Sequence, residues 1–124
     1  MLFRSVEAVV PYEYLMSRTD PDLVKIELDI GWLAYAGRDP VAYLERYSGR
    51  VVACHLKDYD PKMPGVREHK LVPPGEGTID FPAVLAAMSA AQVTHGFIEI
   101  DVSDDPLAGV RRGHEHLSHL QACA

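Results

Sequence analysis

The chain has 124 residues, of which 48% are hydrophobic and 24% are charged. This composition is that of a globular domain, and it excludes wholesale disorder and membrane spans, which need about 20 consecutive apolar residues. Twelve basic residues stand against 18 acidic ones, giving a net charge of −6 without any basic run, so neither a membrane nor a nucleic acid is an expected partner. With no signal-peptide pattern and no paired cysteines, a cytoplasmic protein is expected.

Four helices are predicted, mostly from their start signals. The first covers residues 11–18. The second begins at the Asp39-Pro40 pair, which places a capping carboxylate before a proline at the first helical position, and it ends before Gly49. Asp80 caps the third helix, and the Asp105-Pro106 pair starts the fourth. The buried stripe of that fourth helix is predicted to comprise Leu107, Val110, His114, Leu117 and Leu120.

Three segments alternate apolar and polar residues as half-buried strands do. They are VKIELD at residues 24–29, VVACHLKDYD at 51–60, which opens with apolar residues and then turns polar, and GFIEIDV at 96–102. Because successive side chains of a strand point to opposite faces, each segment has one apolar face and one face with chargeable groups. In the second segment, Cys54 lies on the apolar face and is predicted to be a core thiol.

The order of these elements predicts an α/β fold. Strands that alternate with helices are typical of parallel sheets with right-handed crossovers, arranged as a barrel or as an open sheet. No glycine-rich phosphate loop follows a strand, which disfavours an open nucleotide-binding sheet. The loop at residues 59–80 is long enough for a functional lid, with a short extra strand near residues 70–72 and Glu76 as a candidate for contacting substrate hydroxyls.

The polar strand faces predict a metal site. The carboxyl ends of parallel strands meet at one edge, so Asp29, His55 and Glu99 are expected to lie close together. Two carboxylates and one imidazole suit a divalent cation, Mn²⁺ foremost and Mg²⁺, Co²⁺ or Zn²⁺ otherwise. Taken singly, Asp29 could equally cap a turn, His55 could be a core histidine, and Glu99 could pair with a lysine. Lys57 follows on the same face as His55 and is a candidate for stabilising developing negative charge, or simply a solvated ion-pair partner.

Four motifs give the chain a resemblance to a known family. They are D-x-G-x-x-x-x-x-G-x-D-P from Asp29, G-R-V-x-x-x-H-x-K-D from Gly49, P-G-E-G-x-x-D-F from Pro74 and E-x-D from Glu99. In this order and spacing the chain, from about Val6 onward, resembles the C-terminal part of sugar phosphate isomerases and epimerases with the xylose isomerase-like barrel. That group also contains inosose dehydratases.

The resemblance implies a (β/α)₈ TIM barrel with its active site at the carboxyl ends of the strands. It implies that Asp29, His55 and Glu99 are metal ligands from the last three strands, with Glu99 also acting as acid or base. The fourth ligand of the family, a glutamate one strand earlier, has no counterpart, since Glu7 and Glu13 fall in a helical stretch. A complete barrel takes about 250 residues, so residues 1–124 are predicted to form part of a barrel domain, with residues 1–5 foreign to it.

One departure bears on the substrate. Many relatives have histidine three residues after the strand aspartate, where this sequence has Trp32. An indole offers a stacking face and one donor in place of acid–base capacity, or it only walls the pocket. Asp101, on the same strand face as Glu99, is predicted to contact substrate or to orient the ligands.

Three functions remain open at this stage. The first is a metal-dependent isomerase or epimerase that acts on a small sugar, sugar phosphate or polyol ketone through an enediolate, with an inosose dehydratase-like lyase as its variant. The second is a metal-dependent phosphodiesterase of the DNA-repair endonuclease type, which the acidic balance disfavours. The third is a non-catalytic fragment, and for the 124 residues alone we expect little activity and a tendency to self-associate through an open sheet edge.

Overall fold

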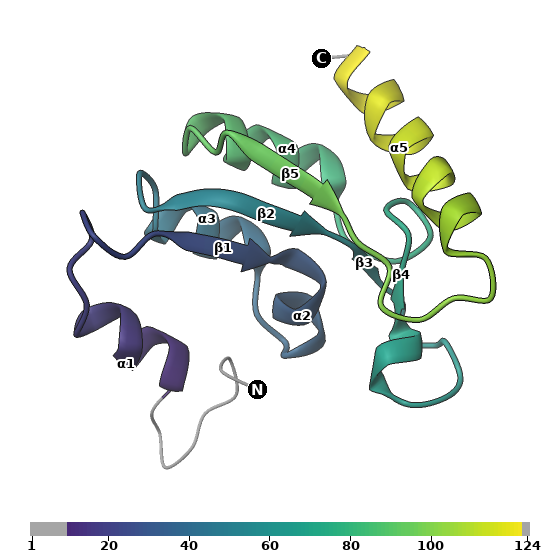
Figure 1. Ribbon diagram of the computed structural model, residues 1–124, viewed down its shortest axis with the longest axis horizontal. Coiled ribbons are helices and arrows are strands. Elements are labelled where there is room, and N and C mark those ends of the chain that lie inside the picture. Colours follow the sequence, from purple (N-terminus) through teal and green to yellow (C-terminus); the bar gives the residue numbers. More distant parts are fainter. Residues whose placement is uncertain (1–9, 123–124) are drawn as a thin grey trace.

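Three parallel strands form the central sheet of the computed structural model, which describes residues 10–122 (Figure 1). They are β1 (Ile26–Asp29), β2 (Val51–Leu56) and β5 (His95–Ile98), in the order β1-β2-β5. The register places Asp29 of β1 directly opposite His55 of β2. The predictions for residues 1–5 and Glu7 fall outside the described part. Within residues 10–122, no helix is long and apolar enough to cross a membrane.

The four predicted helices are present, which confirms an α/β fold of parallel strands alternating with helices. They are α1 (Pro11–Ser17), α3 (Pro40–Arg46), α4 (Phe81–Ala90) and α5 (Pro106–Ala122). Asp39 accepts a hydrogen bond from the Val41 amide at 2.9 Å, and Asp80 accepts one from the Ala83 amide at 3.1 Å. These caps satisfy backbone donors that a helix start leaves without a partner.

One face of the sheet carries the core. Leu28 of β1 and Cys54 of β2 are fully buried, and they belong to one apolar cluster with Leu44 of α3 and Val84 of α4. The helices therefore cover the apolar strand faces, and α3 and α4 lie side by side behind the sheet in Figure 1. The opposite face keeps the chargeable residues, which is the division that the alternation predicts.

A short helix not predicted from the sequence follows β1 at once. It is α2 (Ile30–Tyr35), and Asp29 caps it, because its Oδ1 accepts a hydrogen bond from the Trp32 amide at 2.9 Å. Six residues are too few to show a helical period in the sequence. Gly31 is required in this helix, since a Cβ there would collide with the Cγ atom of Lys57.

The long loop after β2 is folded into a small hairpin. It contains β3 (Asp58–Tyr59), which pairs antiparallel with β4 (Leu71–Val72) after a 3₁₀ turn at Arg67–Lys70. The predicted extra strand near residues 70–72 is thus present. The hairpin stands beyond the carboxyl end of β2, beside α2 (Figure 1).

Three predicted details are wrong. The third strand ends at Ile98, so Glu99 and Asp101 lie on the segment after β5 and not within it. In α5, the predicted burial is confirmed for Leu117 and Leu120, but Leu107 is 69% exposed and His114 is exposed. Gly113 makes a further contact of this helix, against Pro74 and Ile98. The alternation that places Cys54 on the apolar face of β2 predicts the same face for Val52 and the polar face for Val51. The structure has the reverse, with Val51 buried and Val52 exposed, next to a register irregularity between Ile26 and Glu27 of β1.

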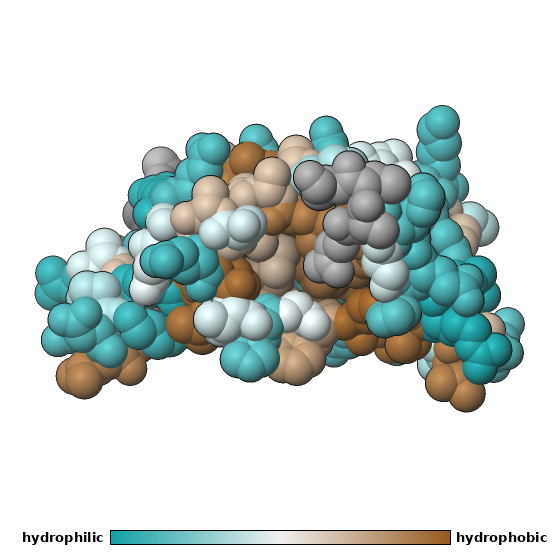
Figure 2. Space-filling model, turned by 90° about the horizontal axis from the view of Figure 1, so that it is seen from above, coloured by the Kyte–Doolittle hydropathy of each residue, from teal (hydrophilic) through white to brown (hydrophobic). Residues whose placement is uncertain are grey.

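Apolar groups are open to solvent around β5. Phe97 pairs with His55, so it lies on the polar face of the sheet, and it is 49% exposed. Beside β5, the helices α4 and α5 line an open pocket of about 920 Å³ whose lining includes Leu85, Ile98 and Leu120. Figure 2 shows the molecule from above, with apolar side chains gathered in a hollow between more polar flanks.

Candidate metal centre

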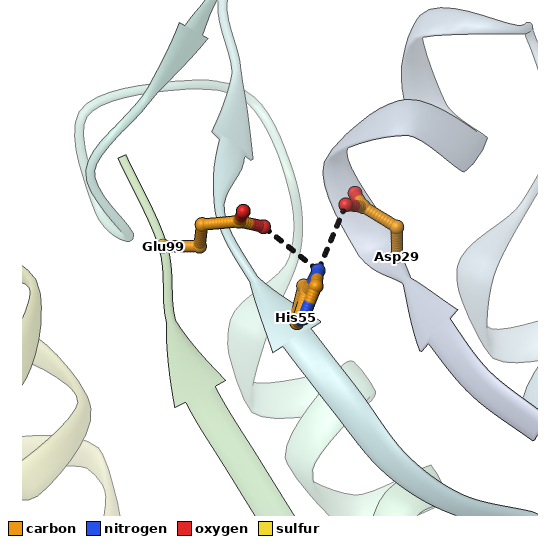
Figure 3. A group of neighbouring side chains, drawn as sticks. All are labelled: Asp29, His55 and Glu99. Carbon is orange, nitrogen blue, oxygen red and sulfur yellow. Dashed lines mark hydrogen bonds and ion pairs between the residues drawn. The ribbon is translucent and has the colours of Figure 1, made fainter. Parts of the chain in front are cut away.

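Asp29, His55 and Glu99 converge at the carboxyl ends of the three parallel strands (Figure 3). Each offers one ligand atom, and these atoms all lie within 4.8 Å of one another. His55 Nδ1 is 2.7 Å from Glu99 Oε2 and 3.4 Å from Asp29 Oδ2. The structure thus brings together the three residues that the sequence selected from separate segments.

The two oxygens of Asp29 have separate tasks. Oδ1 caps α2 through the Trp32 amide, while Oδ2 faces His55. The alternative role of Asp29 as a cap is therefore correct for Oδ1, while Oδ2 is still available as a metal ligand. The cap fixes the carboxylate, so that Oδ2 is held toward the centre without help from any ligand.

The spacing of these atoms is compatible with a divalent cation. Oxygen and nitrogen ligands bind such ions at about 2.0–2.2 Å, which places neighbouring ligand atoms roughly 3 Å apart. The two measured separations from His55 Nδ1, 2.7 and 3.4 Å, lie on either side of this value. Half-buried carboxylates and one imidazole form a donor set that Mn²⁺, Zn²⁺ or Co²⁺ accepts.

Lys57 lies within the same cluster. Its side chain is 2% exposed, and Nζ contacts Glu99 Oε2 and Asp101 Oδ2 at 2.7 Å each and Asp29 Oδ2 at 3.3 Å. The ammonium therefore shares two carboxylate oxygens with His55. The alternative of a solvated ion pair is wrong for this lysine, because the group is buried among carboxylates.

Burial and charge act against each other at the carboxylates. For Asp29, loss of solvation raises the pKa above its usual range, although the Trp32 amide and Lys57 favour ionisation. For Glu99, burial is outweighed by the hydrogen bond and charge of Lys57, which lower the pKa. Glu99 is therefore ionised at neutral pH. The pKa of Lys57 is raised, because its bonds to Asp101 and Glu99 exceed the cost of burial, so the lysine stays protonated.

Glu27 is a member of the site that the sequence prediction missed. Its Oε1 lies 3.1 Å from His55 Nε2, on the ring edge opposite Asp29 and Glu99. A carboxylate at this nitrogen fixes the ring orientation and directs Nδ1 toward the other ligand atoms. The alternation of β1 contains the signal, because Glu27 precedes Asp29 by two residues and so shares its face.

Asp58 is a second missed residue, with a structural task. It is 1% exposed, and its carboxylate accepts hydrogen bonds from four backbone amides, those of Tyr59, Gly75, Gly77 and Ile79, at 2.7–3.1 Å. A Cβ at Gly77 would collide with this carboxylate. Asp58 thereby fixes the P-G-E-G turn beside the hairpin.

Trp32 forms a wall beside the centre. Its ring meets Tyr35 edge to face at 5.4 Å, Tyr35 meets Tyr59 in the same way at 5.8 Å, and the Arg67 guanidinium lies 5.7 Å from the indole centroid. This aromatic row joins α2 to the hairpin. Contact of Trp32 with a substrate stays a prediction.

The other predicted substrate contacts have different surroundings. Asp101 pairs with Lys57 and thus borders the cluster. Glu76 instead pairs with Arg112 of α5, with 2.6 Å between Oε1 and Nε. The predicted contact of Glu76 with substrate hydroxyls stays a prediction, and its observed partner links the turn to the last helix.

Comparison with known proteins is consistent with this geometry. The family model described as a xylose isomerase-like TIM barrel matches residues 11–120. A protein of Clostridium beijerinckii named inosose dehydratase is 34% identical over 113 residues, which cover 82% of this chain and 38% of that protein. The chain thus spans less than two fifths of the length of that relative.

Solved structures share the fold. The crystal structure of a sugar phosphate isomerase/epimerase from Parabacteroides distasonis matches with a TM-score of 0.72 and 25% identity, covering 89% of this chain and 36% of that chain. An IOLI protein, described with a bound zinc atom, matches with a TM-score of 0.63 and 18% identity over 90% of this chain and 40% of that chain. Both matches place the three strands within a TIM barrel.

Proposed function

Because this chain belongs to the xylose isomerase-like TIM barrel family, we propose that it supplies the metal-binding half of a divalent-metal-dependent isomerase or epimerase. The proposed substrate is a small sugar, sugar phosphate or polyol ketone. The observation that carries the proposal is the convergence of Asp29 Oδ2, His55 Nδ1 and Glu99 Oε2 at the carboxyl edge of a parallel sheet, where barrel enzymes place their active sites.

The residues of the cluster suit proton transfer next to a carbonyl group. A divalent ion, when held by Asp29, His55 and Glu99, supplies electrophilic polarisation of a substrate oxygen. Glu99 is ionised at neutral pH and takes the proton from the neighbouring carbon as general base. Lys57 remains charged and stabilises the negative charge that develops on the substrate oxygen. Trp32 bounds the substrate on the side of α2 and orients its ring.

A second candidate is elimination of water from a polyol ketone. The 34% identity to the Clostridium beijerinckii protein named inosose dehydratase favours it. Both reactions begin with removal of a proton beside a carbonyl group, so the same base and the same cation serve either. They differ in the fate of the carbanion, which is reprotonated in one case and expels hydroxide in the other.

Product analysis distinguishes the two reactions. The chain, and any longer protein that contains it with a complete barrel, are incubated with Mn²⁺ in deuterated water, with ketoses, ketose phosphates and inosose as substrates. Isomerisation or epimerisation yields an isomer of the substrate, in which deuterium marks a proton taken up from solvent, whereas elimination yields a product lighter by one water. We expect turnover from a complete barrel that contains these residues and little from residues 1–124 alone. A complete barrel that turns over none of these substrates, with or without Mn²⁺, would contradict the proposal.

The Glu27 contact gives a testable prediction on metal affinity. Replacing Glu27 by glutamine is expected to weaken Mn²⁺ binding about 10-fold or more, as loss of a partner behind a ligating histidine usually does. The reason is that His55 Nε2 loses the carboxylate that orients the ring. Affinity is measured by titration of free Mn²⁺ in electron paramagnetic resonance.

The matched control for this change is Glu45→Gln. Glu45 lies on α3 and is exposed, so the same loss of charge occurs away from the centre. Its Mn²⁺ affinity is expected to stay near that of the unchanged protein. Equal effects of the two variants would show that net charge, and not the orientation of His55, sets the affinity.

A further inference from the structure

Lys57 occupies a position that a divalent cation would contest. Its Nζ contacts Asp29 Oδ2 and Glu99 Oε2, and these are the same two oxygen atoms that approach His55 Nδ1. An ion bound to these oxygens would lie close to the ammonium, and the two like charges would repel each other strongly in a half-buried site. A bound cation and the observed lysine contacts therefore compete.

The same lysine has a partner outside the triad. Asp101 Oδ2 accepts a hydrogen bond from Lys57 Nζ at 2.7 Å, and Asp101 is not among the three clustered ligands. The stem of Lys57 is held at its base, where Gly31 leaves room for its Cγ and Cδ atoms. The ammonium can thus shift by a rotation of its terminal bonds while the stem stays in place. Asp101 provides the contact that remains.

The charge balance of the cluster supports a role for this arrangement. Three carboxylates meet at the ammonium, those of Asp29, Glu99 and Asp101, and the ion pairs of residues 10–122 give them no other lysine or arginine. Without the ammonium these partly buried carboxylates would repel one another. In the absence of a metal ion, Lys57 supplies the positive charge that keeps them together.

We infer that Lys57 is a positioning residue that acts as a built-in substitute for the metal ion. In the metal-free protein its ammonium holds Asp29 and Glu99 in their binding arrangement, and on metal binding it is displaced from these two oxygens and retained by Asp101. The lysine thereby preforms the site and at the same time lowers the affinity for the cation. This inference rests on the proposed function, since it concerns the same metal site.

The test is a double-mutant cycle read as Mn²⁺ affinity. Lys57→Met is expected to tighten Mn²⁺ binding about tenfold, because the competing charge is gone, and this size is within the usual range for groups in contact. Asp101→Asn is expected to weaken binding by a similar factor, because Lys57 then has no partner outside the triad. In the double variant the effect of Asp101→Asn is expected to vanish, since its action passes through Lys57.

Two control variants show whether the changes in Mn²⁺ affinity follow from net charge alone. Lys25→Met removes an exposed positive charge, and Asp104→Asn removes an exposed negative charge near Asp101; both should leave Mn²⁺ affinity within about twofold, as screened surface charges do. The melting temperature without metal is a second readout. It should fall in Lys57→Met and recover on adding Mn²⁺ by more than it does in the unchanged protein.

The possible outcomes are distinct. Unchanged or weaker Mn²⁺ binding by Lys57→Met, with normal binding by the unchanged protein, overturns the inference and leaves the proposed function intact. If Lys57→Met does not fold, the test rests on the Mn²⁺ affinity of Asp101→Asn. The inference is overturned if Asp101→Asn binds Mn²⁺ at least as tightly as the control Asp104→Asn does. If neither the unchanged protein nor Lys57→Met binds Mn²⁺, both proposals fail together.

Discussion

Replacement of Glu99 by glutamine is expected to abolish measurable Mn²⁺ binding, with a loss larger than the roughly 10–100-fold that follows removal of a partner behind a ligand. Glu99 Oε2 is one of only three ligand atoms in the described cluster, and it lies 2.7 Å from both His55 Nδ1 and Lys57 Nζ. Glutamine keeps the size of the side chain but removes the negative charge. A divalent ion would then face one carboxylate and one imidazole.

The same change is expected to abolish turnover by a complete barrel that contains these residues, because an amide cannot take up the proton. Glu115→Gln serves as the control, since Glu115 is an exposed glutamate of α5 and the charge change is identical. Binding and turnover are measured by Mn²⁺ titration and by the deuterium assay. Metal content that is unchanged in the Glu99 variant would remove the basis of the assignment.

Replacement of Asp58 by asparagine is expected to lower the free energy of unfolding by about 3 kcal/mol or more, since each hydrogen bond to a charged group contributes roughly 1.5–3 kcal/mol. Oδ1 accepts from the amides of Tyr59 and Ile79, and Oδ2 accepts from those of Gly75 and Gly77. Asparagine can present only one acceptor oxygen. Its amide group would face two backbone donors, which then lose their acceptor.

Urea unfolding followed by circular dichroism gives the free energy of unfolding for this comparison. Asp60→Asn is the matched control, because Asp60 lies two residues along and accepts only one amide bond, from Lys62 at 2.8 Å on the surface. That change is expected to cost no more than about 0.5 kcal/mol. Equal losses in the two variants would contradict the role assigned to the buried carboxylate.

Amide hydrogen exchange gives a local check on Asp58. In the Asp58 variant, exchange at Gly75, Gly77 and Ile79 should accelerate more than exchange in the sheet, because these amides lose their acceptor directly. Uniform acceleration over the whole chain would indicate global destabilisation only. The turn would then have no special dependence on Asp58.

The cluster was predictable because it depends on the simplest regularity of a sheet. A period of two and a common strand direction are enough to bring Asp29, His55 and Glu99 to one edge, although the three are far apart in sequence. The same rule could have identified Glu27. Helix starts were also predictable, because Asp39, Asp80 and Asp105 each precede a proline or an apolar period and do cap a helix.

Other features depend on contacts between residues that are distant in the sequence, and a sequence pattern does not predict such contacts. Asp58 follows a lysine, which suggests a local pair, yet three of its four partners are amides 17 to 21 residues later that come near only when the turn folds back. The burial of Lys57 results from α2, which is too short to show a period. Two positions on the predicted stripe of α5, Leu107 and His114, were mispredicted because small residues, Gly109 and Gly113, make part of its contacts, and hydrophobicity patterns give such residues little weight.

The direct pairing of Asp29 with His55 across β1 and β2 has a thermodynamic consequence. The atoms of the site exist as neighbours only while the sheet is assembled, so an unfolded chain offers no comparable site and any affinity for a cation is linked to folding. At one hundred times its dissociation constant, such a ligand adds about 2.7 kcal/mol to the unfolding free energy. Chelation would then act as a mild denaturant, whose strength is set by the free metal concentration of the solution.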